Sequence, residues 1–366
     1  MQKLPSSLVP FLGAVAATLP LIATPAHAQG TVTLYGILDS AMRYVHNDAV
    51  GSIKSLVSGS GMTSRLGVRG VEDLGGGLTA SFNLEHGVLV DSGTQASASQ
   101  FWDRRSIVAI ADKQLGEVRL GRDYTPNFTN WARFDPFGYT GAASAGNLIN
   151  TTAVGPVRSA FGTGLAPTVR SSNAVQYVLP GGLGGVEGVV MVAAGEGGLS
   201  ANAQHKLTSA RLGYTAPTFE ISVVHAQIEN DLTTAGKLKD SGIGGTVSLA
   251  GAKFSGALRV FKYADAKQLL MLLSAVVPLG VAGELKFSIN RAKFDGRVGA
   301  TSIDGNASTQ LAMGYVHSLS KRTALYTTAS WITNKGRAAA VVPGGPPGLP
   351  AGGDSKGCEA GLRHSF

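Results

Sequence analysis

The stretch Gly357-Cys358-Glu359-Ala360-Gly361-Leu362-Arg363-His364-Ser365-Phe366 ends the chain, and its side chains alternate between two kinds. One face would carry mostly apolar side chains, namely Cys358, Ala360, Leu362, His364 and Phe366. The other face would carry Glu359, Gly361, Arg363 and Ser365. A side-chain period of two is the period of a β-strand. A chain that stops on an aromatic residue directly after such a strand is typical of the closing strand of a membrane-spanning β-barrel.

Residues 1–28 have the pattern of a secretory signal peptide. Lys3 is the only charged residue of this segment, an apolar stretch follows at 8–22, and Ala26-His27-Ala28 has the small-x-small pattern of a cleavage site. The apolar stretch is shorter than the ~20 residues that a membrane-spanning helix needs. We therefore favour a removable signal over an anchor, and we expect residues 29–366 to form one β-barrel domain.

Composition narrows the class of protein. The 366 residues include 50 glycines and only 15% charged residues, which suits a sheet with many turns. The single cysteine, Cys358, rules out an internal disulfide, although a secreted chain enters an oxidising compartment. A formal net charge of +8 raises the question of a nucleic-acid partner. The basic residues are spread along the chain without a run of five or six, so we expect no nucleic-acid partner.

Alternation with a period of two recurs along the mature chain. Leu285, Phe287 and Ile289, for example, alternate with the polar residues of 284–290. Such segments run to about 10–12 residues, the length of a tilted membrane-spanning strand. We place sixteen of them at 31–45, 61–70, 78–88, 100–111, 117–123, 168–179, 186–195, 204–214, 219–229, 239–250, 253–263, 267–277, 282–293, 307–318, 322–333 and 355–366.

The connections between these segments sort by length. The odd-numbered ones are mostly long, at 46–60, 89–99, 124–167, 196–203, 230–238, 294–306 and 334–354. The even-numbered ones are short, at 71–77, 112–116, 180–185, 215–218, 251–252, 278–281 and 319–321. The exception is 264–266, a short link where a long one is expected. Long loops on one side and short turns on the other are the rule for bacterial outer-membrane barrels, and an even strand number places both chain ends in the periplasm.

The run from Leu269 to Gly283 fits this pattern less well, because both of its faces are apolar. A single-pass anchor is the alternative interpretation. Pro278 interrupts the run, and Lys267 and Glu284 bracket it. We interpret it as a strand, a turn at Pro278-Leu279-Gly280 and the start of the next strand.

Six short motifs then support a resemblance to a known family. They are Val32-Thr33-Leu34-Tyr35-Gly36 with Asp39; Ser64-Arg65-Leu66-Gly67-Val68-Arg69-Gly70 followed by Glu72-Asp73-Leu74-Gly75; Leu120-Gly121-Arg122-Asp123-Tyr124; Val169-Arg170-Ser171-Ser172-Asn173 with Gln176-Tyr177; Leu319-Ser320-Lys321-Arg322-Thr323 with Tyr326; and Gly361-Leu362-Arg363-His364-Ser365-Phe366. With these motifs in this order, nearly the whole mature chain resembles the general trimeric porins of Gram-negative bacteria, especially their basic, anion-preferring branch.

The resemblance implies a fold, a function and partners. The fold would be a sixteen-stranded antiparallel transmembrane β-barrel, assembled as a homotrimer in outer-membrane lipid. The function would be passive diffusion of small hydrophilic solutes and anions through a water-filled channel. The barrel-assembly machinery would recognise the C-terminal strand through Phe366.

The resemblance also points to the third loop, from about 125 to 167. In this family the loop folds back into the barrel and narrows the pore. Here it carries Arg133 and Asp135. The family often has an acidic residue between the equivalents of Pro136 and Phe137, and its absence here weakens any cation preference. A long external loop is the alternative, but loops beyond about 12–15 residues are usually functional or disordered, and we expect the inward-folded third loop.

Family porins place a ladder of arginines on the wall opposite that loop. The matching positions are Arg65, Arg105 and Arg170, with Arg158 as an alternative to Arg170. Guanidinium groups stay charged at any working pH, and several of them in a narrow passage attract anions and repel cations. The alternative is that these arginines only pair with loop carboxylates such as Asp135. We expect a net anion preference.

Six aromatic residues fall near strand ends, where rings at the two membrane interfaces are expected. They are Tyr35, Tyr177, Tyr214, Tyr315, Tyr326 and Trp331.

The sequence carries no Cys-x-x-Cys, His-Glu-x-x-His or Gly-x-x-x-x-Gly-Lys pattern, and its one Gly-x-Ser-x-Gly match, at 353–357, leads into the closing strand rather than into the helix of a nucleophile elbow. We therefore expect no catalytic residues, no metal site, no cofactor and no enzymatic activity. Two other functions stay open: a channel specific for one nutrient anion, and a barrel without an open pore that has a structural or adhesive role.

Overall fold

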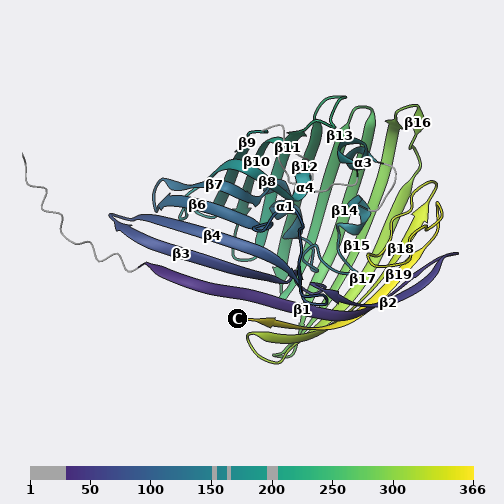
Figure 1. The fold of residues 1–366 in the computed structure, drawn as a ribbon, viewed down its shortest axis with the longest axis horizontal. Helices are drawn as coiled ribbons and strands as arrows, with labels where there is room; N and C mark the ends of the chain where they lie inside the picture. The colour runs from purple at the N-terminus through teal and green to yellow at the C-terminus, as the bar shows by residue number, and fades with distance from the viewer. Residues whose placement is uncertain (1–29, 151–154, 163–165, 196–204) are drawn as a thin grey trace, which may run out of the picture.

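The computed structural model describes residues 30–150, 155–162, 166–195 and 205–366. The predicted signal peptide, residues 1–28, lies outside this part of the chain. The described residues form an antiparallel sheet that closes on itself, with the segment after β7 folded into its interior (Figure 1).

Sixteen long strands of the described chain make the wall. They are β1 (Thr31–Asn47), β3 (Arg65–Gly75), β4 (Leu78–Leu89), β6 (Arg105–Asp112), β7 (Gly116–Tyr124), β8 (Arg170–Val178), β9 (Val186–Ala193), β10 (Lys206–Thr215), β11 (Phe219–Glu229), β12 (Leu238–Leu249), β13 (Ala252–Tyr263), β14 (Ala266–Leu279), β15 (Gly283–Val298), β17 (Ala307–Ser318), β18 (Thr323–Lys335) and β19 (Ser355–Ser365). Three further strands lie in the long connections: β2 (Gly51–Ser58), β5 (Thr94–Gln95) and β16 (Thr301–Ser302). The predicted sixteen-stranded barrel is confirmed.

The first and last strands close the barrel. They pair in antiparallel register from Ile37 opposite Ser365 to Asn47 opposite Ser355. Phe366 extends this pairing, because its backbone N–H and C=O both bond to Gly36 at 3.1 Å. The two strands lie side by side at the bottom of Figure 1, one purple and one yellow. The predicted closing strand therefore closes the sheet.

The two faces of the wall differ as the alternation predicted. The aliphatic members of the outward face are exposed, for example Val223, Leu311 and Leu362. Inward positions are polar or small, such as Glu359, which is 3% exposed. An apolar exterior and a polar interior suit a barrel with lipid outside and water inside.

Two predicted strands begin later than expected. The segments 61–70 and 100–111 correspond to strands that begin at Arg65 and Arg105. Residues before Arg65 instead wrap around the buried carboxylate of Asp39. This carboxylate accepts three backbone N–H bonds, from Ser60, Gly61 and Met62, and the hydroxyl of Tyr326 at 2.6 Å. A local carboxylate–amide network competes here with the strand ladder.

The predicted loop 46–60 is also partly wrong, because it contains β2. This strand pairs with the second half of β1, from Ser40 opposite Ser58 to Asn47 opposite Gly51. By contrast, the short link after β13 is confirmed. Ala264 and Asp265 alone join Tyr263 to Ala266.

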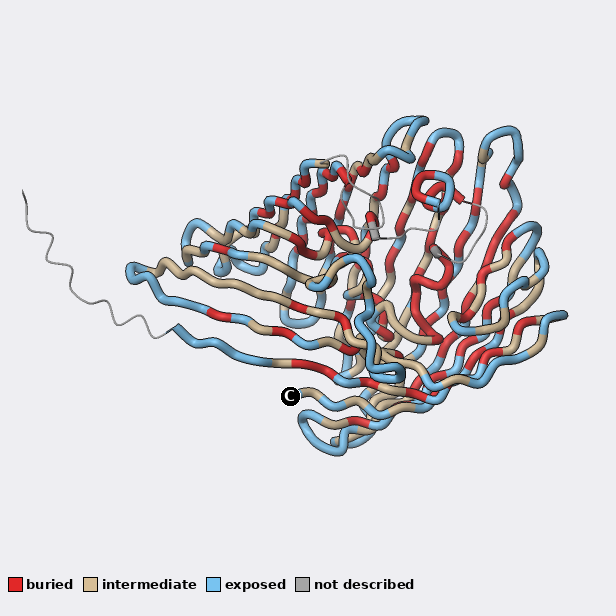
Figure 2. Tube along the Cα trace, viewed as in Figure 1, coloured by how far each residue is buried: buried red, intermediate tan, exposed pale blue. Residues whose placement is uncertain are grey.

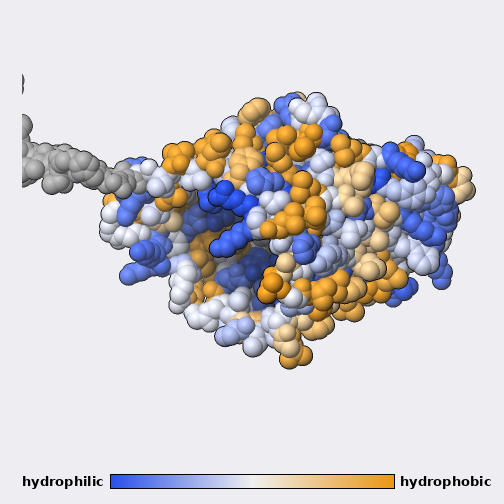
Figure 3. Space-filling model, turned by 90° about the horizontal axis from the view of Figure 1, so that it is seen from below, coloured by the Kyte–Doolittle hydropathy of each residue, from blue (hydrophilic) through white to orange (hydrophobic). Residues whose placement is uncertain are grey.

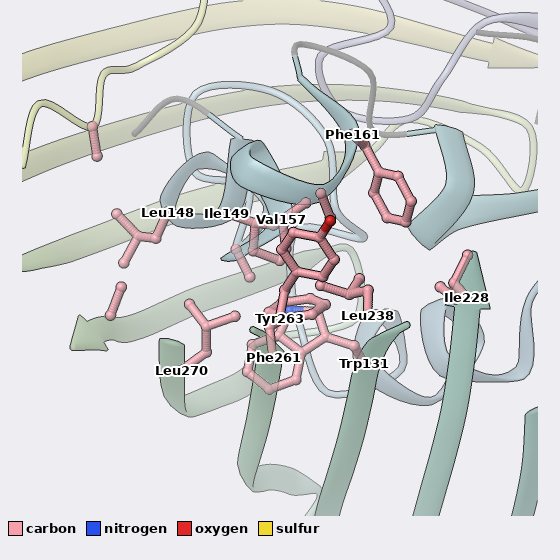
Figure 4. Packing of buried hydrophobic residues seen from close by; sticks show 14 of the residues in the cluster. Trp131, Leu148, Ile149, Val157, Phe161, Ile228, Leu238, Phe261, Tyr263 and Leu270 are labelled. Carbon is pink, nitrogen blue, oxygen red and sulfur yellow. The ribbon is translucent and has the colours of Figure 1, made fainter. Parts of the chain in front are cut away.

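The third loop lies inside the barrel. It forms α1 (Pro126–Ala132), α2 (Asn147–Asn150), α3 (Pro156–Phe161) and α4 (Ala166–Val169), which lie against inward faces of the wall. Buried apolar residues join this loop to β11–β14 (Figure 4), and they include Trp131, Leu148, Phe161, Phe261 and Leu270. Figure 2 shows the same buried segments gathered within the barrel and exposed residues at the hairpin tips.

Packing of the third loop against the inner face of β14 explains the unusual apolar run at 269–283. The inward side chains of Leu270 and Leu272 are about 1% exposed, and they belong to the cluster that holds Leu148 of the third loop. β14 is apolar on both faces because lipid lies on one side and a packed loop on the other. No described helix is long and apolar enough to cross a membrane.

Two of the six aromatic residues are not at a membrane interface. Tyr35 faces inward and donates its hydroxyl to Asn83, and Tyr326 binds Asp39. Tyr177, Tyr214 and Trp331 are exposed on the outer face, as predicted for girdle positions. Tyr35 directly follows the outward Leu34, and Tyr326 directly follows the outward Leu325, so alternation itself places both rings on the inner face.

Candidate pore constriction

The inward face of β3, β4, β6, β7 and β8 carries a cluster of arginines, here called the arginine wall. Glu85 on β4 holds two of them: its Oε2 lies 3.3 Å from Arg65 Nε, and its Oε1 lies 2.6 Å from Arg104 Nε. Both side chains are partly buried: 20% of the Arg65 side chain and 28% of the Arg105 side chain are exposed. Arg65 and Arg105 thus lie on the same inward surface, on strands that both pair with β4.

Tyr124 at the end of β7 organises three guanidinium groups. Its hydroxyl accepts hydrogen bonds from Arg104 at 2.6 Å and from Arg170 at 3.1 Å. The guanidinium carbons of Arg170 and Arg105 lie 4.6 Å and 5.6 Å from its ring centroid. Cations are attracted to the face of an aromatic ring, so one phenol positions three arginines, two from the start of β6 and one from the start of β8.

A β-bulge in β8 lies beside two more charged residues, Arg122 and Asp123 of β7. The register between β7 and β8 shifts between Gly121 and Asp123. Gly121 has φ +124°, and a Cβ at this position would lie 2.2 Å from the carbonyl oxygen of Ser106. Only glycine fits there. Arg122 and Asp123 are both buried next to this bulge, and a bulge commonly redirects side chains at such a point.

Asp123 is a second counter-charge of the wall, in addition to Glu85. Its Oδ1 lies 2.7 Å from Arg105 Nε, and its Oδ2 lies 3.6 Å from Arg119 Nη1. Arg119 also pairs with Glu117 at 2.7 Å. These contacts hold the guanidinium groups at the wall and neutralise part of their charge.

Positive charge still exceeds negative charge on this surface. It carries seven guanidinium groups and four carboxylates: Arg65, Arg69, Arg104, Arg105, Arg119, Arg122 and Arg170, with Glu85, Asp103, Glu117 and Asp123. A surface hollow with hydrophilic residues at its rim and depth is visible in Figure 3. Charges of one sign in such a passage concentrate ions of the opposite sign.

Asp135 of the third loop does not contact the arginine wall. Its carboxylate accepts backbone N–H bonds from Phe137, Tyr139 and Ala145 at 2.9 to 3.0 Å. Burial raises the pKa of the Asp135 carboxyl, and the three amide donors act in the opposite direction. The carboxylate therefore faces its own loop and stabilises the turn after α1.

The remaining predicted site residues lie elsewhere in the loop. Arg133, at the end of α1, pairs with Glu187 at 2.8 Å and with Glu220 at 3.2 Å. Arg158 is exposed on α3, which packs against β12, β13 and β14. The structure thus groups Arg170, and not Arg158, with Arg105 around Tyr124.

The opposite wall anchors the loop through a buried ion pair. Arg259 donates to both carboxylate oxygens of Asp240, at 2.9 and 2.7 Å, and its guanidinium lies 5.9 Å from the ring centroid of Trp131. The side-chain amide of Asn127 donates to the backbone carbonyl of Asp240 at 2.8 Å. The third loop therefore packs against β12 and β13.

The sequence prediction missed Arg104, Arg119, Arg122, Asp123 and Tyr124 as site residues. Three of them lie in the motif Leu120–Tyr124 that supported the family resemblance, and Arg104 adjoins Arg105. Strict alternation would place Arg122 and Tyr124 on the outer face. In the sequence, Gly121 is the one sign that the strand is irregular here and that alternation fails. No group of three or more His, Cys, Asp or Glu residues that could hold a metal ion occurs among the described residues.

Comparison with known proteins agrees with this architecture. Residues 13–337 match the Gram-negative porin family. The chain is 34% identical to outer membrane porin protein 32 of Delftia acidovorans over 357 residues, which is 93% of this chain and 95% of that protein. It is 26% identical to an outer membrane porin protein of Bordetella pertussis over 370 residues, which is 87% of this chain and 93% of that protein.

Solved structures give the same result. The anion-selective porin from Comamonas acidovorans is similar, with 32% identity, a TM-score of 0.77, and coverage of 92% of this chain and 100% of that one. OmpT of Vibrio cholerae shares the fold, with a TM-score of 0.64 at 13% identity and coverage of 93% and 100%.

Proposed function

The chain belongs to the Gram-negative porin family, and we propose that its channel prefers anions because of the arginine wall. The protein is an outer-membrane porin, a barrel whose water-filled channel lets small hydrophilic solutes diffuse passively. Its family and fold are those of a channel rather than of an enzyme.

The main support for an anion preference is the excess of guanidinium groups over carboxylates on one inward surface. The third loop adds little negative charge, because Asp135 is the only acidic residue between 125 and 169 and its carboxylate is bonded to backbone amides. The similar porin from Comamonas acidovorans is described as anion-selective, which agrees with this proposal.

The test is the reversal potential of single channels in a planar bilayer under a salt gradient. The Arg65→Ser, Arg105→Ser double variant removes two positive charges and leaves Glu85 and Asp123 less compensated. A unit charge at 4 Å is worth about 1 kcal/mol even at the dielectric constant of water, which corresponds to about a fivefold change in a permeability ratio. We expect the chloride-to-potassium permeability ratio to fall at least that much. The fall should shrink toward 1 M salt, where the Debye length is only ~3 Å.

Two controls separate this effect from a general loss of charge or packing. Arg291→Ser with Arg297→Ser removes two arginines from exposed positions outside the barrel, and Leu285→Val changes the outer face of β15. Both should keep the wild-type reversal potential. An unchanged reversal potential in the open Arg65→Ser, Arg105→Ser channel would refute the assigned constriction.

We further propose three features of biogenesis and assembly. Residues 1–28 act as a signal peptide that is removed, the barrel-assembly machinery recognises the strand that ends at Phe366, and the barrels associate as a homotrimer. The outward side chains of Val32, Leu34 and Leu362 form an exposed apolar surface that suits contact between barrels. OmpT of Vibrio cholerae has been solved in a trimer form, which agrees with such an assembly.

A further inference from the structure

Three lysines lie directly opposite one another on the outer face of three neighbouring strands. Lys239 on β12 pairs in register with Lys262 on β13, and Lys262 pairs with Lys267 on β14. We call these three residues the lysine row. Side chains directly opposite across a pair of strands have Cβ atoms about 4.5–5.5 Å apart, and like charges in this arrangement repel each other.

The lysine row lacks internal compensation. None of its ammonium groups forms an ion pair within the described part of the chain, whereas nearby Lys206 and Lys237 both pair with Glu229, at 3.5 and 3.8 Å. Asp295 on β15 lies opposite Lys267 but forms no ion pair with it, and Lys293 adds another outward positive charge two residues further along. Three opposed positive charges without a partner in the chain favour binding of an external anion.

The row lies at one depth, next to the apolar band. Lys262 and Lys267 are separated from the chain reversal at 264–265 by one residue each. Val260 and Leu269, two positions along the same outward faces, begin the aliphatic surface, about 7 Å from the row along each strand. This is where lipid head groups meet acyl chains, and long lysine side chains reach head groups from such positions.

The short link between β13 and β14 leaves this surface uncovered. It is the two-residue exception among connections that are otherwise long on this side of the barrel. A longer loop at this point could fold over the three ammonium groups. Without one, the row is open to the outer leaflet of the membrane.

We propose that the lysine row binds the phosphate groups of lipopolysaccharide in the outer leaflet. Lipid A carries phosphates at the depth of the row, and its phosphates otherwise need divalent cations to offset their mutual repulsion. The lysines and the phosphates thus each supply the charge that the other lacks. β15, β17 and β18 separate β14 from β19, so the row is away from the proposed contact surface between barrels on β1 and β19.

The test measures binding of purified lipid A to the full-length mature protein refolded free of lipopolysaccharide, by native mass spectrometry. The phosphorylated form is compared with the dephosphorylated form. The wild-type barrel should bind the phosphorylated form about tenfold or more tightly. The Lys239→Gln, Lys262→Gln, Lys267→Gln variant should bind both forms equally.

A matched control removes three positive charges from turns on the opposite side of the barrel. Lys113→Gln, Lys321→Gln, Arg322→Gln changes exposed residues of the β6–β7 and β17–β18 turns, and it should keep the wild-type preference for phosphorylated lipid A. If the triple variant of the row does not fold, Lys262→Gln should reduce the preference and Lys262→Arg should retain it.

Two results would overturn the proposal. One is a folded variant of the row that still prefers phosphorylated lipid A as strongly as the wild type. The other is displacement of lipid A by inorganic phosphate alone, which would make the row a site for free phosphate. Neither readout depends on ion selectivity, so a failure here is distinct from a failure of the proposed anion preference.

Discussion

Asp123 is, with Glu85, one of two carboxylates that each pair with two guanidinium groups of the arginine wall. It contacts two guanidinium groups from the inward face of β7. Asp135, which carries the only acidic side chain of the third loop, acts on its own backbone instead. The same residue type therefore has an electrostatic role in one place and a structural role in the other.

Replacement of Asp123 by Asn should strengthen anion preference. The change removes a negative charge 2.7 Å from Arg105 and leaves the guanidinium groups in place. We expect the chloride-to-potassium permeability ratio to rise by about two- to fivefold at 0.1 M salt, where the Debye length is ~10 Å. The sign is opposite to that for Arg65→Ser with Arg105→Ser, and the same bilayer measurement checks it.

Asp135→Asn is the matched comparison for that experiment. An amide oxygen can still accept part of the backbone hydrogen bonding at this position, and the carboxylate that is lost does not face the wall. The reversal potential should therefore move far less than in the Asp123→Asn channel. A larger shift from Asp135→Asn than from Asp123→Asn would contradict our assignment of the two carboxylates.

At the level of elements, the closing strand is held by its last residue. Phe366 makes two backbone hydrogen bonds to Gly36. A Cβ atom on residue 36 would lie only 2.4 Å from Cζ of the Phe366 ring. Glycine at position 36 therefore leaves room for the terminal ring. The C-terminal aromatic residue is part of the seam as well as a proposed recognition signal.

Deletion of Phe366 should lower the amount of protein in the outer membrane by about tenfold or more, because closure and the proposed recognition signal are lost together. Quantitative blotting of membrane fractions measures this. Phe366→Tyr keeps an aromatic ring and both backbone bonds, and it should restore normal levels. Refolding into detergent separates the two causes, since a seam defect alone would also slow refolding without the assembly machinery. Normal outer-membrane levels of the truncated chain would show that this residue is dispensable.

How much the sequence predicts also differs between elements. Strands with lipid on one side and water on the other, such as β11 and β17, have the predicted bounds, because alternation records both environments. β14 alternates poorly because the third loop packs on its inner face through residues such as Leu270. The bulge at Gly121 and the network around Asp39 were not predictable from periodicity, since both depend on contacts between distant segments. They determine the surroundings of Arg122 and Tyr326, and so the candidate site was only partly predicted.

At the level of the whole molecule, the exterior of the barrel is not uniform. β1 and β19 present exposed apolar side chains at the seam, while β12 to β14 carry the lysine row near one edge. A surface that binds lipid phosphate and a surface that contacts another barrel have different chemistry. Their separation around the wall would let one barrel have both of the proposed contacts.

The proposed homotrimer should therefore depend on the β1 surface. Leu34→Glu places a carboxylate on the outward face of β1, where the side chain is 61% exposed in the single barrel, and a charge buried between barrels without a partner is costly. We expect the wild type to migrate as a trimer on gels without boiling and the variant to migrate as a monomer, with light scattering as a second measurement. Val247→Glu is the control, because Val247 is 54% exposed at a comparable distance from the strand end on β12. This control places the same carboxylate on a lipid-facing surface, with the same cost of exposing a charge to lipid, and it should leave the trimer intact. Loss of the trimer in both variants, or in neither, would count against a contact surface on β1.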